Sequence, residues 1–239
     1  MSDLDFAVRT TGAVARIDIN RPDDGNMLTR AMMTRLAEIL RDLGSRPEHN
    51  VVVIEGRGSD FCRGRDGKGE SSKGMSAYEM RTKLMGATLG VYEAISAVPV
   101  PVVALVHGPA TGFGAAMAAA CDITLAASGA RFSFPEIKHG IPPTMAMAAI
   151  LHKVPPKALA YLIYSGAELS ADQAVTFGLA SCVYPQASFA SQSETFVTDL
   201  ASRSRLNLET IKKYQLGAAD LTAAMASEYA GVLMAVVRA

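Results

Sequence analysis

The sequence of 239 residues contains little of what marks several specialised classes of protein. It has no tryptophan and only three cysteines, at positions 62, 121 and 182, without CxxC spacing. That excludes a disulfide scaffold and a cysteine zinc cluster. Net charge is also absent, because 23 Lys and Arg balance 23 Asp and Glu, so no overall field attracts nucleic acid or an anionic membrane. The first residues lack the pattern of a secretory signal, so we expect a cytoplasmic protein.

One long stretch, residues 94–121, lacks Asp, Glu, Lys and Arg altogether and is long enough to raise the question of a membrane span. Prolines and glycines interrupt it, and a spanning helix would have to find partners for every backbone group that those breaks release. We therefore expect no membrane insertion. The stretch is better interpreted as a buried strand, a turn and a buried helix of small residues.

The remaining composition and periodicity indicate an α/β protein. Hydrophobic residues make up 49% and charged residues 19%, which supports a sizeable core. The spacing predicts a hairpin over residues 6–20, a helix capped by Thr29, and buried strands at 51–54, 102–107 and 123–127. A further helix is expected over 76–97, and everything after residue 144 reads as helical. Strands that alternate with helices, followed by a helical last third, favour an α/β fold with a helical C-terminal region.

Two glycine-containing segments are candidates for binding an anion. The loop Phe61-Cys62-Arg63-Gly64-Arg65-Asp66 follows a buried strand, where α/β folds place ligands, and residues 57–83 contain seven basic but four acidic side chains. The alternative is an ordinary solvated loop. Residues 107–114 run from a strand into a helix, whose free N–H groups bind anions. Dinucleotide binding is weakly supported there, because Met117 occupies the place of the third small residue.

A third candidate is a single acid. Glu136 lies in an apolar stretch behind Phe132 and Phe134, and a carboxylate in such surroundings tends to have a raised pKa that suits acid–base work. The alternative is a partly exposed loop glutamate.

Taken in order, these motifs resemble those of the enoyl-CoA hydratase/isomerase (crotonase) superfamily. The resemblance includes Asn20-Arg21-Pro22, the 61–66 loop, Gly108-xxx-Gly112-x-Gly114, Cys121-Asp-Ile and Pro135-Glu-Ile. It implies a ClpP/crotonase-like fold of repeated ββα units over residues 1–185. Residues 186–239 would form a short helical region for trimerisation that stops before the family's last helix. The implied substrate is an acyl-CoA thioester, with no separate cofactor because coenzyme A is part of the substrate, and the implied assembly is a homotrimer or hexamer.

The resemblance also assigns site residues. The backbone N–H groups of Arg63 and Phe113 would hold the thioester oxygen, and Glu136 matches the second of the two family glutamates. Coenzyme A would lie near the basic loop. Its predicted contacts are Met27, Gly64, Arg65, Asp66 and Lys68.

The reaction depends on where this sequence departs from the family pattern. The first family glutamate falls on Ala116, and the usual glycine-rich stretch after Pro-Glu-Ile is replaced by Pro142-Pro143-Thr144-Met145-Ala146. Hydration usually uses two carboxylates, whereas a shift of a double bond needs one base. Isomerisation is therefore the leading prediction, and hydration or a related lyase step by Glu136 alone is the alternative. A non-catalytic CoA-ester-binding subunit is a third interpretation, and a nucleotide-dependent dehydrogenase a fourth. The Arg63 side chain would either bind a substrate carboxylate or face solvent.

Overall fold

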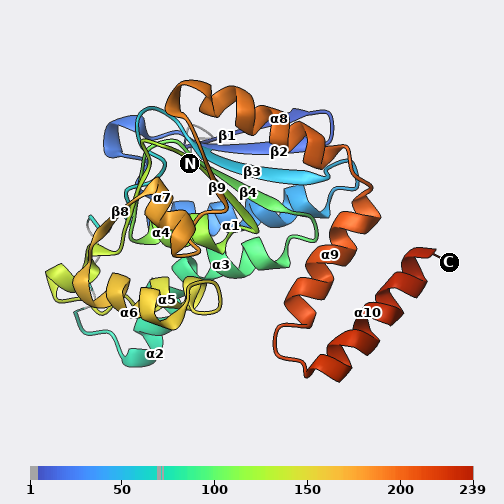
Figure 1. Ribbon diagram of the computed structural model, residues 1–239. Helices are drawn as coiled ribbons and strands as arrows, with labels where there is room; N and C mark the ends of the chain where they lie inside the picture. The colour runs from blue at the N-terminus through green and yellow to red at the C-terminus, as the bar shows by residue number, and fades with distance from the viewer. Residues whose placement is uncertain (1–4, 69–70, 72, 239) are drawn as a thin grey trace.

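The computed structural model describes residues 5–68, 71 and 73–238, which form two β-sheets and the helices around them (Figure 1). The larger sheet has the strand order β1-β2-β3-β4-β6-β9 and the smaller one β5-β7-β8. The strands are β1 (Phe6–Thr11), β2 (Val14–Ile19), β3 (Val51–Gly56), β4 (Val102–Val106), β5 (Pro109–Thr111), β6 (Ile123–Ala127), β7 (Arg131–Ser133), β8 (Glu168–Ser170) and β9 (Cys182–Tyr184). The helices are α1 (Arg30–Ser45), α2 (Ala77–Glu79), α3 (Gly86–Ala97), α4 (Phe113–Ala120), α5 (Thr144–Ile150), α6 (Pro156–Ser165), α7 (Ala171–Thr176), α8 (Phe189–Ala201), α9 (Arg205–Gly217) and α10 (Ala223–Arg238).

The N-terminal half follows its local sequence signals closely. β1 and β2 form the predicted antiparallel hairpin, and the strands that follow in the larger sheet are parallel. Thr29 caps α1, with its side chain accepting a hydrogen bond from the Met32 N–H at 3.3 Å. Ser76 opens the next helical segment with a capping box, and the π-helical turn Met80–Met85 joins α2 to α3. The predicted α/β class and helical C-terminal region are confirmed.

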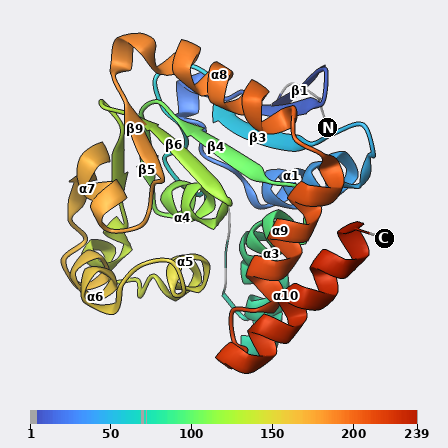
Figure 2. The same ribbon diagram turned by 45° about the vertical axis from the view of Figure 1, so that its right-hand side comes forward.

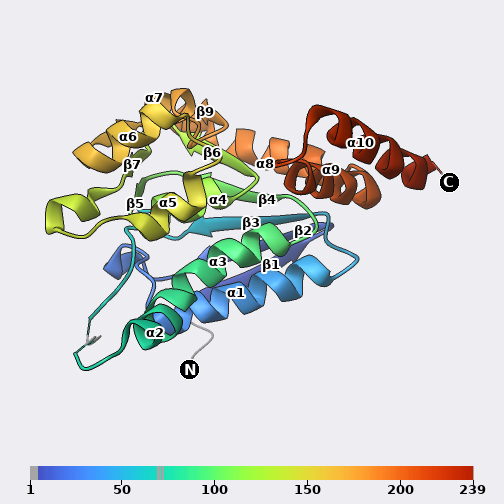
Figure 3. The ribbon, with the colours of Figure 1, turned by 90° about the horizontal axis from the view of Figure 1, so that it is seen from below.

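The central strands β2, β3, β4 and β6 of the larger sheet are buried on both faces, and alternate residues of each strand point to opposite sides. Ile17, Ile54 and Ala104 belong to the core shared with α1 and α3, whereas Val53 and Val103 pack with side chains of α8. Figure 3 shows α1 and α3 on one side of the sheet and α8 on the other. The family resemblance implies a core fold in residues 1–185. Helix α8 lies beyond that boundary, yet its side chains form one layer of the core.

A buried lysine ties α9 to this core. Lys212 is 3% exposed, and its Nζ donates to Asp122 Oδ2 at 2.7 Å and to the Ile95 carbonyl at 2.9 Å. Beyond this contact α9 and α10 extend away from the sheets, as Figure 2 shows, and Tyr214 stacks on Tyr229 to hold the two helices together with ring centroids 5.9 Å apart.

Three short strands depart from the prediction. β5 lies in the segment that we expected to be a turn, and β8 and β9 lie in the last third, so the prediction that this third is wholly helical is wrong. Each has three residues and pairs with a strand distant in sequence, so local periodicity carries no signal for it.

The uncharged stretch 94–121 is divided among the end of α3, β4, β5 and α4. No helix in the described ranges is long and apolar enough to cross a bilayer.

Candidate functional site

Two loops and the start of α4 meet at one edge of the sheets. Cys62 forms a parallel bridge with Ala110 of β5, and Arg65 forms another with Leu28. Gly114, in the first turn of α4, packs directly on the Cys62 carbonyl, where any side chain would collide with the backbone. This close approach brings the 61–66 loop against the N-terminus of α4. Between them and residues 135–146 lies a cavity of about 340 Å³, called here the Glu136 cavity.

The cavity collects most of the predicted site residues. Its lining includes Arg63, Gly64, Arg65, Phe113 and Glu136. Met27, Asp66 and Lys68 do not line it. The prediction of these three as coenzyme A contacts therefore has no support from the cavity itself.

Glu136 presents its carboxyl group to the cavity from the 3₁₀ turn η3 (Pro135–His139). Its Oε2 is buried without a hydrogen-bond partner. Gly112 has a φ of +53°, and a Cβ on it would lie 2.6 Å from Glu136 Oε1, so only glycine leaves room for the carboxyl group. Burial raises the pKa of Glu136, while a hydrogen bond from its own backbone and the nearby His139 oppose that rise. A carboxyl group in this state can both accept and return a proton.

The N-terminus of α4 lies beside this acid, and the amides on either side of Phe113 already have backbone partners. The Gly112 N–H donates to the Ser133 carbonyl at 2.8 Å, and the Ala116 N–H donates to the Gly112 carbonyl at 3.0 Å. Phe113 is the first residue of α4, where a helix leaves N–H groups without intrahelical partners. Its amide therefore suits the role predicted for it at an oxyanion.

The predicted role of the Arg63 N–H is wrong, because that amide donates to the Gly25 carbonyl at 2.9 Å. The two neighbours of Arg65 both bond to Leu28. The Gly64 carbonyl accepts a hydrogen bond from the Leu28 N–H, and the Asp66 N–H donates to the Leu28 carbonyl. In a parallel bridge of this kind the peptide groups of the central residue, here Arg65, face the opposite side. The Arg65 amide thus faces away from Leu28.

The Arg63 side chain follows the adjacent loop. Its aliphatic stem packs on Gly25, where a Cβ would lie 2.6 Å from Arg63 Cδ, and its Nε lies 3.7 Å from Asp60 Oδ1. The side chain is 60% exposed. Of the two orientations considered from the sequence, the structure therefore supports the one that faces solvent.

Asp66 organises the loop and does not face the cavity. It accepts a hydrogen bond from the Lys68 N–H at 3.1 Å and pairs with Arg21 at 3.4 Å, and both interactions hold the pKa of its carboxyl below the usual range. Arg21 also donates to the Met27 carbonyl at 2.8 Å. Asp66 and Met27 are thus joined through Arg21, away from Glu136.

Sequence reasoning missed three polar residues of the cavity, Thr88, Tyr92 and Thr111. Tyr92, on α3, lines it, and the tyrosine hydroxyl is buried without a hydrogen-bond partner. Its ring stacks on Phe113 with centroids 5.8 Å apart. A lone aromatic residue in a helical pattern reads as core, so no local signal could have identified it. Ala116, at the position of the first family glutamate, is fully buried and brings no carboxyl group.

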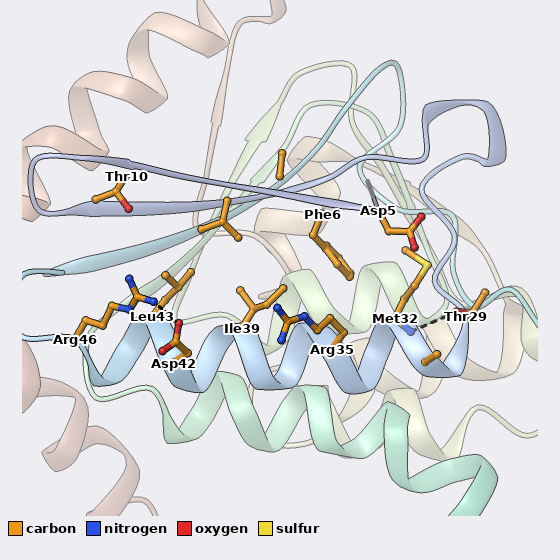
Figure 4. Close-up of a pocket in the computed structure, with 13 residues that line it drawn as sticks. Asp5, Phe6, Thr10, Thr29, Met32, Arg35, Ile39, Asp42, Leu43 and Arg46 are labelled. Atoms are coloured by element: carbon orange, nitrogen blue, oxygen red, sulfur yellow. Dashed lines mark hydrogen bonds and ion pairs between the residues drawn. The ribbon is translucent and has the colours of Figure 1, made fainter. Parts of the chain in front are cut away.

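A larger cavity of about 600 Å³ lies between β1 and α1 (Figure 4). Several of its polar side chains are engaged in local structure: Thr29 caps α1, and Arg46 pairs with Asp42 at 2.7 Å. The buried unpartnered hydroxyl and carboxylate oxygens of the described chain, on Tyr92 and Glu136, both belong to the smaller cavity. Size alone would therefore indicate the wrong site.

The layers around this cavity form the crotonase fold, and comparisons with known proteins identify the family. The family model for enoyl-CoA hydratase/isomerase matches residues 9–231. Zebrafish (Danio rerio) enoyl-CoA hydratase domain-containing protein 3, mitochondrial, is 31% identical over 73% of this chain and 60% of its own length. The 2,3-dehydroadipyl-CoA hydratase of Escherichia coli is 30% identical over 84% of this chain and 77% of its own length. The crystal structure of enoyl-CoA hydratase from Mycobacterium smegmatis has a TM-score of 0.90 and 28% identity, covering 97% of this chain and 90% of that one. The chain belongs to the enoyl-CoA hydratase/isomerase family.

Proposed function

We propose that this protein moves a proton along the acyl chain of an acyl-CoA thioester, with Glu136 as its single carboxyl acid and base. The observation that carries the proposal is the half-buried Glu136 carboxyl group, which lines the cavity and has a buried, unpartnered Oε2. The first turn of α4 has alanine at position 116 and so brings no second carboxyl group. One carboxyl group suffices for a 1,3 shift of a double bond, which is the leading reaction.

In that reaction the Glu136 carboxylate removes a proton from C2 of a 3-enoyl thioester. The C2–H bond breaks, and its electrons spread into an enolate whose negative charge resides on the thioester oxygen. Protonated Glu136 then returns the proton to C4, which leaves the double bond between C2 and C3. The amide of Phe113 supports the enolate oxygen from the start of α4, and the Arg65 amide replaces that of Arg63 as the second donor. Each such donor contributes about 3 kcal/mol toward the transition state.

Coenzyme A enters this proposal as part of the substrate. Arg65 and Gly67 line the cavity on the basic loop, and Lys68 continues the same loop, so a phosphate-bearing ligand would find cations there. We further propose that the protein assembles as a homotrimer or hexamer. The cytoplasmic location stays a prediction from the sequence.

Hydration is the second candidate. It is favoured by Tyr92, whose hydroxyl is a buried polar group in the same cavity, and by the name of the Escherichia coli relative, which is a hydratase of an acyl-CoA thioester. A non-catalytic CoA-ester-binding subunit is the third candidate, in which Glu136 would serve no proton transfer.

The test offers 2-enoyl- and 3-enoyl-CoA thioesters in D₂O and follows the products by NMR and mass spectrometry. Glu136→Gln should lower turnover at least about 100-fold, because it removes the only proposed base, while CoA-ester affinity is kept. Glu93→Gln, on the exposed part of α3, is the matched control and should keep full activity. Migration of the double bond with deuterium uptake supports isomerisation, and a product heavier by one water supports hydration. Turnover that survives in Glu136→Gln would refute the proposal, and binding without any turnover in the wild type would leave the CoA-ester-binding subunit.

A further inference from the structure

Tyr92 is out of place as a purely structural residue. It is 8% exposed, and its ring lies nearly parallel to that of Phe113, at an interplanar angle of 25°. A phenylalanine would make the same stacking contact. The hydroxyl adds a buried polar atom without a partner, which is unfavourable in a folded protein. Such an atom in a cavity wall points to a ligand that completes its hydrogen bond.

The surroundings of the hydroxyl narrow the chemistry of that ligand. Ile141, Met145 and Ala146 give the cavity apolar walls, and Thr88 already directs its hydroxyl to Met33 Sδ at 3.5 Å. Burial and the charge of Glu136 raise the pKa of Tyr92, so the phenol keeps its proton and acts as a donor. A plain alkyl chain would fill this space but leave the phenol unpaired, whereas a chain with an oxygen beside Glu136 would pair with it.

We propose that the Tyr92 hydroxyl donates a hydrogen bond to an oxygen on the acyl chain, close to the carbons on which Glu136 acts. The inference rests on the proposed function, because it takes the Glu136 cavity as the acyl site. It names Tyr92 as the residue that distinguishes an oxygen-bearing acyl group, such as a 3-hydroxyacyl group, from its saturated counterpart.

Tyr92 also compensates in part for the carboxyl group that Ala116 lacks. In hydration the water oxygen bonds to C3 while Glu136 takes one of its protons, and the electrons of the C2–C3 double bond move to the thioester as an enolate. Protonated Glu136 then delivers that proton to C2. Throughout, Tyr92 keeps its own proton and holds the oxygen that becomes the 3-hydroxyl group. In isomerisation the same hydroxyl would select substrates with an oxygen substituent already in place.

The test compares two ligands that differ by one oxygen. Calorimetry measures the affinity of the wild type and of Tyr92→Phe for 3-hydroxyhexanoyl-CoA and for hexanoyl-CoA. We expect Tyr92→Phe to bind the hydroxy ester about tenfold more weakly and the saturated ester with unchanged affinity. Tyr164→Phe, at a residue that is 82% exposed on α6, is the matched control and should change neither affinity.

Thermal unfolding separates this role from a structural one. Because the hydroxyl has no partner in the free protein, Tyr92→Phe should unfold at the same temperature as the wild type or a higher one. A lower unfolding temperature would overturn the inference, because it would mean that the hydroxyl stabilises the free fold. Equal affinities of Tyr92→Phe and the wild type for both esters would overturn it as well, while leaving the role of Glu136 intact. If neither ester binds the wild type, the proposed function itself fails and this inference with it.

Discussion

At the scale of the residue, the environment of Glu136 sets the pH at which this protein can act as a base. The group works only as a carboxylate, and burial raises the pKa of its carboxyl group above the ordinary range. His139 lies in the wall of the same cavity, and its charge favours the carboxylate. The balance between burial and this cation therefore decides how much of the base is present as the pH falls.

Replacing the cation should move the pH profile of catalysis. The rate constant kcat/KM should rise with pH as Glu136 loses its proton, because only the carboxylate accepts one from the substrate. His139→Gln removes the positive charge, raises the pKa of Glu136 further, and should shift this acid limb to higher pH. His152→Gln, at an exposed position outside the cavity, is the control. Superimposable profiles for His139→Gln and the wild type would contradict this electrostatic role.

At the scale of the element, the position of α4 depends on how closely two backbones approach. Gly114 lets the first turn of α4 rest on the Cys62 carbonyl, and this contact holds the amide of Phe113 opposite the 61–66 loop. A methyl group at this point would push helix and loop apart, because a backbone carbonyl cannot turn aside as a side chain can.

Two glycine-to-alanine substitutions separate the effect of this close backbone contact on stability from the effect of helix propensity. Gly114→Ala should lower the free energy of unfolding by about 1–3 kcal/mol through overpacking, and it should lower turnover by moving the Phe113 amide. Gly90→Ala is the matched control, because its added methyl group in α3 has open space and should stabilise the helix by up to about 1 kcal/mol. Urea denaturation measures both effects. If Gly114→Ala is as stable as the wild type, the proposed contact does not constrain α4.

At the scale of the whole molecule, α10 lies apart from the two sheets (Figures 1 and 2). It also exposes apolar side chains. Met225, Val232 and Val236, all more than half exposed, follow one another at helical spacing. Exposed apolar residues in such a row are typical of a surface that meets another protein. This agrees with the homotrimer or hexamer predicted from the sequence.

Light scattering coupled to size exclusion should therefore give a mass of three or six times the 25.2 kDa of the chain. Val232→Glu places a charge in the row and should shift the mass toward that of a single chain, because burying an unpaired charge in the interface is unfavourable. Ser227→Glu, on another face of α10, is the control and should leave the assembly intact. A wild-type protein that elutes as a single chain would refute the predicted assembly.

The sequence by itself determined the features that depend on neighbouring residues. The hairpin, the Thr29 cap, the buried strand β3 and the helical start at Ser76 follow from local patterns. The order of motifs also identified the family, because this many short signals at matching spacing do not recur by chance. Glu136 was also identified from its neighbours, because it is a single acid in an apolar stretch.

Tertiary structure alone decided which groups of the site face one another. The Arg63 amide turns to Gly25, a residue 38 positions earlier, and no local pattern announces that partner. Tyr92 and Glu136 share a cavity although α3 and η3 are separate in the chain, and the short strands β5, β8 and β9 exist only through distant partners. The physical reason is the same in each case: a hydrogen bond or a shared cavity between remote segments is specified by packing, and sequence patterns report only what a residue does with its neighbours.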